Sequence, residues 1–329
     1  MAYGTQDAVD KVSAADAMIA LFTQQGFDVL FSEEYISHSQ PSKRLIVQLD
    51  PITFLRLDFQ RARLGNDSRI YDTLNMYAGT GYTSGSSLDN QSPLMGTPEQ
   101  SSASSHQRQY LSYPCTMHLA TNPDTREFAL CFENHSDDTG RLFAGVHAEM
   151  KTSAPYNDVQ WYFDGVTVYN QSNGAARFSF HQSASATWNT SQAGKLLDRQ
   201  PDGVTANWYN YPGGQSWTGY DWASGWGSIG ATSGTFMGWY SNIWQNIKFE
   251  PSLTSYFLPV LLIYSNNVGS NFDNLKIIKG ECPHMRYCNM LYLGIGQEVI
   301  MNGQRWRTFP GYGAGGTNTH GYAFLEGPE

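Results

Sequence analysis

The sequence predicts a mainly β protein, in which antiparallel, β-sandwich-like sheets are accompanied by one N-terminal helix and long irregular loops. Charged residues make up only 15% of the chain, against about 25% in an average soluble protein. The chain also contains 32 glycines, and 14% of its residues are aromatic. Short runs of β-forming residues recur along it, whereas clear helical spacing occurs in one segment. This composition is typical of a β protein with a polar, largely uncharged surface.

The predicted helix lies between Ser13 and Gln25. Its apolar positions recur at helical spacing and are Ala17, Met18, Leu21 and Phe22. Ser13 stands at the position of an N-cap, and Asp16 follows in the first turn. Gly26 is a stop signal, because glycine readily ends a helix.

Strands are predicted next at residues 27–31, 44–49 and 53–59, the last with apolar residues at Phe54, Leu55, Leu57 and Phe59. From Gly79 to Gln109 the chain is rich in Gly, Ser, Thr, Gln and Asn and has hardly any apolar anchor. A structureless connection of this length is uncommon inside a compact domain. We therefore expect a projecting arm, or a segment that becomes ordered only against a partner.

Residues 110–169 return to β character, with core strands predicted at 128–132 and 159–164. Residues 170–238 form a second irregular zone that contains Trp188, Trp208, Trp217, Trp222 and Trp226. Strands resume at 236–249 and at 257–264. The chain therefore divides into an N-terminal region, 1–170, and an aromatic and glycine-rich region, 171–329, unless the two form one continuous domain.

The C-terminal residues predict a β-hairpin. A short apolar stretch at 291–295 leads into the strand at 298–301, and the aromatic strand at 304–309 follows the dipeptide Asn302-Gly303. Asn-Gly between two such runs is the strongest short-range hairpin signal. A glycine loop and a closing Gly-Tyr-Ala-Phe at 321–324 complete the segment.

Three segments resemble a family of virion structural proteins from tailed bacteriophages. The C-terminal residues 290–329 are similar to the family's C-terminus, residues 14–27 to its opening helix, and residues 117–146 to its central hairpin with the motif Phe143-Ala-Gly145. The resemblance implies a non-enzymatic structural subunit, located in the virion and assembled in the host cytoplasm. It also implies partners that are copies of the chain and other virion proteins, in a ring or a decoration, at the neck or collar, in the tail or in the baseplate.

Two other functions remain open. The tryptophan-rich zone would suit a glycan-binding β-sandwich of a receptor-binding tail or baseplate component, because aromatic faces stack on sugar rings. Tryptophan and tyrosine are also enriched at protein interfaces, which is the preferred interpretation. The third candidate is an outer capsid decoration protein.

Sequence motifs for catalysis or cofactors are weak. The glycine patterns at 225–230 and 311–316 lack the preceding strand and following helix that a dinucleotide site needs. The available carboxylates stand mostly at predicted turns and are Glu33, Glu34, Asp137, Asp138, Asp158 and Asp164. We therefore predict no catalytic residue and no cofactor-binding residue.

Metal binding and disulfide bonds are not expected either. The zinc candidates, whose spacing is not that of a zinc knuckle, are Cys115, His118, Cys282, His284 and Cys288. Four cysteines, with Cys131 as the fourth, are too few for a disulfide framework in a chain of 329 residues. We predict no metal-ligating residue, and we expect reduced thiols rather than Cys115–Cys131 or Cys282–Cys288 bonds.

The charge distribution argues against nucleic acid and membrane partners. The net charge is −9, whereas phosphate binding needs a local excess of Lys and Arg. The densest basic cluster, at residues 56–69, is interrupted by Asp58 and Asp67 and predicts a strand and a turn. No apolar run approaches the length of about 20 residues that a membrane-spanning helix needs.

Overall fold

The structure, a computed structural model, describes residues 3–63, 70–92, 111, 113–122, 124–134, 142–152, 160–165, 194–199, 206–211, 226–228, 257–266, 275–289, 293–310 and 320–328. Its elements begin with β1 (Tyr3–Ala8), α1 (Lys11–Gln24), β2 (Asp28–Ser37), β3 (Gln40–Asp50), β4 (Thr53–Arg63), β5 (Ile70–Gly79), β6 (Cys115–Thr121), β7 (Phe128–Asn134) and β8 (Leu142–Thr152). They continue with β9 (Gln160–Gly165), β10 (Gly194–Arg199), β11 (Ala206–Tyr211), β12 (Trp226–Ser228), β13 (Leu258–Asn266), β14 (Leu275–Asn289), β15 (Gln297–Met301), β16 (Gln304–Pro310) and β17 (His320–Pro328). The predicted mainly β fold is confirmed.

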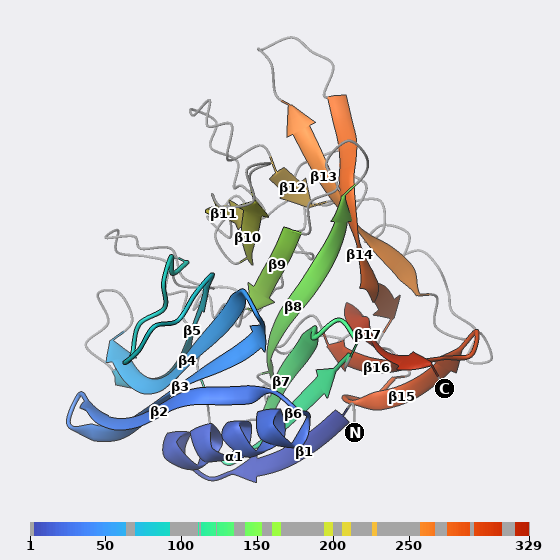
Figure 1. The fold of residues 1–329 in the computed structure, drawn as a ribbon. Helices are drawn as coiled ribbons and strands as arrows, with labels where there is room; N and C mark the ends of the chain where they lie inside the picture. Colours follow the sequence, from blue (N-terminus) through green and yellow to red (C-terminus); the bar gives the residue numbers. More distant parts are fainter. Residues whose placement is uncertain are drawn as a thin grey trace.

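The described strands form two antiparallel sheets (Figure 1). The small sheet has the order β2-β3-β4-β5. The large sheet contains 13 strands along the path β1-β6-β7-β8-β14-β17-β16-β15, with β9 to β13 attached beside it. It continues across position 170, because β8 pairs with β14 and β9 pairs with β10. The division into two regions at that position stays a prediction.

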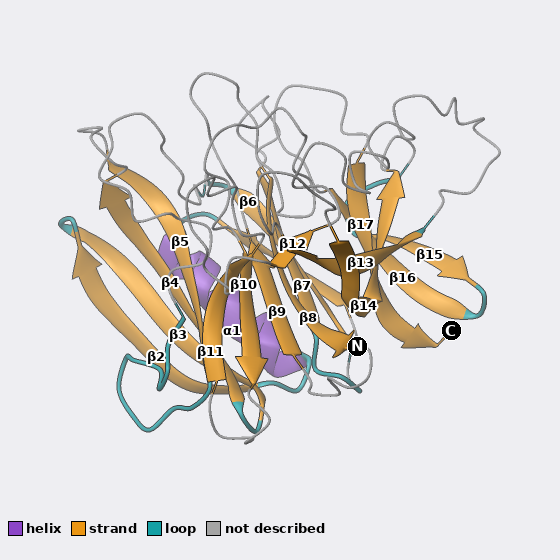
Figure 2. Ribbon diagram, turned by 90° about the horizontal axis from the view of Figure 1, so that it is seen from above, coloured by secondary structure: helices purple, strands orange, loops and turns teal. Residues whose placement is uncertain are grey.

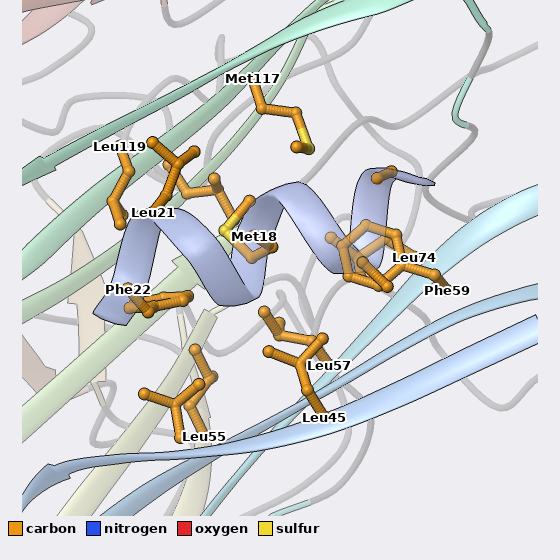
Figure 3. Close-up of a cluster of buried hydrophobic side chains, with 14 of the residues drawn as sticks. Met18, Leu21, Phe22, Leu45, Leu55, Leu57, Phe59, Leu74, Met117 and Leu119 are labelled. Atoms are coloured by element: carbon orange, nitrogen blue, oxygen red, sulfur yellow. The ribbon is translucent and has the colours of Figure 1, made fainter. Parts of the chain in front are cut away.

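Helix α1 lies between the two sheets and supplies the centre of the core (Figure 2). Figure 3 shows its buried side chains Met18, Leu21 and Phe22 among leucines of the small sheet and Met117 and Leu119 of β6. The Phe22 ring meets the Phe128 ring edge to face, with 5.7 Å between centroids. Each such buried side chain contributes roughly 1.5–3 kcal/mol through its removal from water. The apolar spacing predicted from the sequence therefore marks the face on which the sheets pack.

The predicted start of this helix is wrong by a few residues. Asp10, and not Ser13, is the N-cap: its Oδ1 accepts a hydrogen bond from the Ser13 N–H at 2.8 Å. The Ser13 hydroxyl in turn accepts the Asp10 N–H at 3.0 Å, so the two residues form a reciprocal capping box. Asp and Ser both favour the N-cap position. The reciprocal Asp10–Ser13 hydrogen bonds place Asp10 at the N-cap and Ser13 three residues into the helix. The predicted stop at Gly26 is confirmed, since its φ of +81° lies in the left-handed region.

The three strands predicted after the helix are confirmed, and each is longer than expected. Several strands were missed. Three of them, β10, β11 and β12, lie in the zone at 170–238 that was predicted to be irregular, and the others are β1, β5, β14 and β17. β1 reads Tyr-Gly-Thr-Gln-Asp-Ala, which carries no alternation of apolar residues, so only its partner β6 makes it a strand. β5 does alternate, with Leu74, Met76 and Ala78 buried in the core. Residues 236–249, a predicted strand, lie outside the described residues.

The segment at 79–109 begins with a packed turn instead of an unanchored arm. Leu88 is buried and packs with Ile46 and Phe54 on the outer face of the small sheet. Backbone bonds tie the turn down, because Thr80 donates to the Asp89 carbonyl at 3.1 Å and Ser92 donates to the Ala78 carbonyl at 2.7 Å. Leu88 and the partly buried Tyr82 therefore anchor residues 80–92. The rest of the predicted arm lies outside the described residues.

The C-terminal hairpin is confirmed, with its turn at Asn302 (φ +53°) and Gly303 (φ +69°). β17 adds a third strand beside β16. Trp306 of β16 is buried within its own chain. Its ring meets Phe257 edge to face at 5.7 Å.

A second hairpin turn has the same geometry with less suitable residues. His38 (φ +47°) and Ser39 (φ +60°) join β2 to β3 through a two-residue connection. A turn with two positive φ angles favours Asn-Gly, because a side chain in the left-handed region costs roughly 1–2 kcal/mol. The β2–β3 turn is therefore strained compared with the C-terminal turn.

We expect the double substitution His38→Asn, Ser39→Gly to raise the free energy of unfolding by about 1 kcal/mol, because it removes this strain. Chemical denaturation of both proteins measures the change. The matched control is the reverse exchange in the other hairpin, Asn302→His with Gly303→Ser, which should destabilise by a similar amount. Equal stability of all three proteins would contradict the turn geometry.

Candidate functional site

The first and last strands of the chain meet at a cluster of polar side chains. We call this cluster the polar junction and define it as Tyr3, His118, Glu133, Arg307 and Glu326. The residues come from β1, β6, β7, β16 and β17, respectively. Figure 1 shows the start of β1 beside the C-terminal strands. Residues far apart in the sequence therefore share one site.

Strand register places the first three side chains in a diagonal line across one face of the large sheet. Tyr3 is opposite Ala120 and therefore lies diagonally to His118. His118 is opposite Cys131 and therefore lies diagonally to Glu133. Long side chains on one face reach each other across such diagonals. This face is opposite to the one that Met117 and Leu119 turn toward α1.

Hydrogen bonds connect the three side chains in series. Tyr3 Oη lies 2.7 Å from His118 Nδ1, and His118 Nε2 lies 3.1 Å from Glu133 Oε2. Burial raises the pKa of Tyr3 to about 12, although the Arg307 charge opposes this shift. The phenol therefore keeps its proton at neutral pH. With a neutral imidazole, the phenol donates to Nδ1 and the Nε2 proton is donated to Glu133.

Arg307 ties this series to the C-terminal strands. Its guanidinium carbon lies 4.1 Å from the centroid of the Tyr3 ring. Its Nε and Nη2 donate to the two carboxylate oxygens of Glu326 at 2.8 and 2.9 Å. Nη1 donates to the Gly296 carbonyl at 3.1 Å, and Nη2 also reaches Glu298. A bidentate pair of this kind fixes the orientation of the guanidinium plane.

Gly296 closes the junction from the other side. A Cβ atom at this position would lie 2.0 Å from Tyr3 Oη and 3.2 Å from His118 Nδ1. Its φ of +66° is also in the left-handed region. The Tyr3 hydroxyl therefore packs directly against this backbone, and only glycine leaves the necessary room.

The order Tyr-His-Glu has the composition of a nucleophile, a base and an orienting carboxylate. A reacting atom would need to approach Tyr3 Oη, but that oxygen is packed against the Gly296 backbone. Arg307 covers one face of the ring. The geometry therefore suits fastening of β1 to the C-terminal strands, and it does not suit attack on a substrate.

A second set of polar contacts lies at the connection between β6 and β7. Glu127 is fully buried, contacts His284 of β14 and accepts a hydrogen bond from Thr125 Oγ1 at 2.5 Å. Asn122 Nδ2 donates to the Leu325 carbonyl of β17 at 3.2 Å. Arg126 Nη1 donates to the Gly26 carbonyl after α1, at 2.9 Å. This connection therefore joins the helix to the C-terminal strands.

A third polar cluster lies on the outer face of the small sheet and is centred on Asp58. This buried carboxylate accepts from Arg44 Nε at 2.6 Å and from Arg56 Nη2 at 2.6 Å. Each guanidinium also lies over a tyrosine ring, Arg44 over Tyr35 at 4.7 Å and Arg56 over Tyr77 at 4.9 Å. The two arginines are therefore held by groups of their own sheet and, for Arg56, by Gln91 Oε1 at 3.3 Å.

The histidines considered for zinc have other partners. His118 bonds to Tyr3 and Glu133, and His284 contacts Glu127. Within the described ranges, no three metal-ligating side chains come together. The Cys282 side chain lies outside them.

The cysteine side chains that the structure describes are buried. Cys115 and Cys131 have free thiols, and the Cys288 thiol is buried as well. Burial raises the pKa of Cys115 to about 12 and raises the pKa values of Cys131 and Cys288 further. A thiol with a raised pKa forms little of the reactive thiolate near neutral pH.

We expect these three thiols to resist alkylation by iodoacetamide at pH 8 in the native protein and to react after denaturation, because they are buried and protonated. Mass spectrometry of the digested protein measures the reaction at each cysteine. Rapid native alkylation of Cys131 would contradict its position in the sheet.

The candidate carboxylates and the glycine patterns lie apart from the polar junction or outside the described residues. Glu33 and Glu34 lie on β2, and not in a turn, and form ion pairs with Arg44 and Lys43. Residues 226–228 of the first glycine pattern are strand β12, which does not suit a phosphate loop. Asp164 belongs to β9. Its side chain, together with Asp137, Asp138, Asp158 and residues 311–316, lies outside the described part.

The polar junction was missed by the sequence-based predictions. Tyr3 and His118 are 115 positions apart, and no local spacing connects them.

Among the described residues, no helix has both the length and the apolar character needed to cross a membrane. Searches of protein-family models and of curated proteins find no match to the chain.

Proposed function

We propose that the protein is a non-enzymatic structural subunit of a tailed bacteriophage virion, which assembles with copies of itself and with neighbouring virion proteins. The observation that carries this proposal is that the polar junction holds β1 against the C-terminal strands. Tyr3 and His118, which are capable of acid-base chemistry, instead hold the first strand against the C-terminal strands. The Tyr3 phenol oxygen packs against the Gly296 backbone.

The C-terminal segment supports the proposal, because it carries the sequence resemblance and also completes the junction. It folds as the hairpin β15–β16 with β17 beside it. Gly296, Arg307 and Glu326 all belong to it. A segment with this closing role suits a subunit whose C-terminus is a structural element.

Apolar side chains on strand edges also support assembly. β2 and β15 end the strand orders of the two sheets. Large hydrophobic residues are exposed on both, namely Leu30 and Ile36 on β2 and Ile300 on β15. Ile36 is 70% exposed. Edge strands with exposed apolar residues are surfaces that neighbouring chains cover.

Within the particle we propose the head–tail junction or collar first, and the tail or baseplate second. The chain lacks the slender, repetitive character of a fibre and the compactness of a tube subunit. The virion would then be its final location, after assembly in the host cytoplasm. Glycan binding by the tryptophan-rich zone and capsid decoration are the alternatives that the test must separate.

The test uses a phage that carries the gene and an otherwise identical phage with a stop codon in it. Quantitative mass spectrometry of gradient-purified particles should find several copies of the chain per virion. The mutant should accumulate separate heads and tails if the chain belongs to the junction. Normal mutant particles, with the chain absent from the wild-type virion, would contradict the proposal.

Two further results would favour the alternatives. Binding of the purified subunit to expanded heads alone would indicate a decoration protein. Binding to host polysaccharide, lost on substitution of tryptophans in residues 170–238, would indicate a glycan-binding component. Both measurements use the same purified protein.

A further inference from the structure

Strand β1 contributes little to the core. It ends the large sheet and, among the described strands, pairs with β6 alone. Only its last residue, Ala8, is buried, and its other residues are half-buried or exposed. The neighbouring β6 is buried at every residue except Thr116. A polar strand therefore covers the edge of a strand that belongs to the core.

Specific side-chain contacts hold β1 in place. Tyr3 bonds to His118 at 2.7 Å, and Asp7 accepts from Thr116 Oγ1 at 2.6 Å. Both partners lie on β6. Because little apolar surface is buried, detaching β1 costs less than detaching a core strand would. These side-chain contacts therefore select the strand that pairs with β6, but they add little to the free energy that holds it there.

The connection between β1 and α1 is short and exposed. Only Val9 and Asp10 separate the two elements, and Val9 is 73% exposed. The helix start is fixed by the Asp10–Ser13 capping box and by the ion pair between Lys11 and Asp72 at 3.3 Å. Short connections beside a fixed element favour exchange of the terminal strand between copies.

The sheet edges at β2 and β15 are poorer acceptors than β6. β2 carries an extra residue at Leu30 and two central glutamates, Glu33 and Glu34. Bulges and charges of this kind oppose strand addition. β15 offers only 5 residues. In contrast, β6 presents 7 residues, and its pairing with β1 is regular along six consecutive partners.

We propose that in the assembled state β1 of one subunit pairs with β6 of a second copy of this chain. This inference rests on the proposed assembly function. The second copy is the occupant because β1 already matches β6 in register and in side chains. The incoming Tyr3 would take the place between His118, Arg307 and Gly296 of its neighbour, and its Asp7 would bond to the neighbour's Thr116. The exchange re-forms the β1–β6 pairing with the neighbour's strand, while β1 stays joined through Val9 and Asp10 to α1 of its own subunit.

The experiment uses mixed isotopic labels and leaves the native cysteines in place. Chains labelled with ¹⁵N and unlabelled chains, each with a photo-crosslinking amino acid at Gln6, are assembled together. Gln6 is exposed and lies opposite Met117 of β6. Strand exchange predicts cross-linked β1–β6 peptide pairs of mixed label as often as pairs of uniform label.

A cysteine experiment checks the same register independently. With the four native cysteines replaced by serine, one chain carries Asp7→Cys and a second carries Thr116→Cys. Oxidation of the mixed assembly should give a covalent dimer. The control pair, Ile300→Cys with Arg305→Cys in one chain, spans a two-residue hairpin turn and should give only a bond within the chain.

Two results overturn the strand exchange. If the chain assembles, but every photo-crosslinked pair has a uniform label and no covalent dimer forms, β1 stays in its own subunit and the assembly function stands. If the chain neither associates nor enters particles, the exchange and the proposed function fail together. Because the photo-crosslinking variant keeps all native cysteines, a folding defect of the serine background does not affect the first measurement.

Discussion

Replacing Gly296 with Ala should destabilise the protein far more than replacing Gly303 with Ala. Both glycines have φ angles in the left-handed region, +66° and +69°. The added methyl group therefore costs roughly 1 kcal/mol of backbone strain at either position. At Gly296 it would also lie 2.0 Å from Tyr3 Oη, whereas at Gly303 nothing lies within 4 Å. We expect a loss of about 3 kcal/mol at Gly296, because overpacking adds to the strain.

Urea denaturation measures both losses. A second control tests the cause of the difference, because Tyr3→Ala removes the two atoms that lie nearest to the added methyl group. In the Tyr3→Ala background, Gly296→Ala should cost about as much as Gly303→Ala, roughly 1 kcal/mol. Equal losses for the two glycines in the wild-type background would show that Tyr3 does not pack against Gly296.

Replacing Asp58 with Ala should cost about 3 kcal/mol, because the change leaves two sheltered guanidinium groups without their shared carboxylate. The Asp58 side chain is 3% exposed, and it lies 2.6 Å from both arginines. The matched control is Glu33→Ala. Glu33 lies 3.6 Å from Arg44 and is 44% exposed, so its loss should cost less than about 1 kcal/mol.

Thermal and urea denaturation of the two variants compare these losses. A triple variant with Leu at Asp58, Arg44 and Arg56 should recover much of the stability, since apolar side chains of similar size often replace a buried ion cluster without loss. A small effect of Asp58→Ala would indicate that water reaches this face of the sheet.

Local signals in the sequence predicted the elements that depend on local geometry. The hairpin at Asn302-Gly303 was predictable, because these residues tolerate the positive φ angles that the turn requires. The helix was predictable from its apolar spacing, although its start depended on a reciprocal bond between Asp10 and Ser13. Residues 80–92 are anchored by Leu88, by the partly buried Tyr82 and by backbone hydrogen bonds, which composition alone did not reveal.

Contacts between distant segments had no such signal. β1 has a polar sequence and becomes a strand because β6 offers it an edge. Tyr3, His118 and Glu133 are brought together by the register of three strands, and Arg307 comes from the other end of the chain. The turn that joins β6 to β7 makes the same kind of connection through Glu127 and His284. Tertiary pairing, and not sequence spacing, creates each of these sites.

An electron cryomicroscopy reconstruction of the intact virion tests the proposed structural role most directly. We expect density for this chain in several copies around the particle axis, with the two-sheet fold recognisable and the exposed residues Leu30, Ile36 and Ile300 in contact with neighbouring chains. A reconstruction in which other proteins account for all of the density would contradict the proposed role of this chain as a structural subunit.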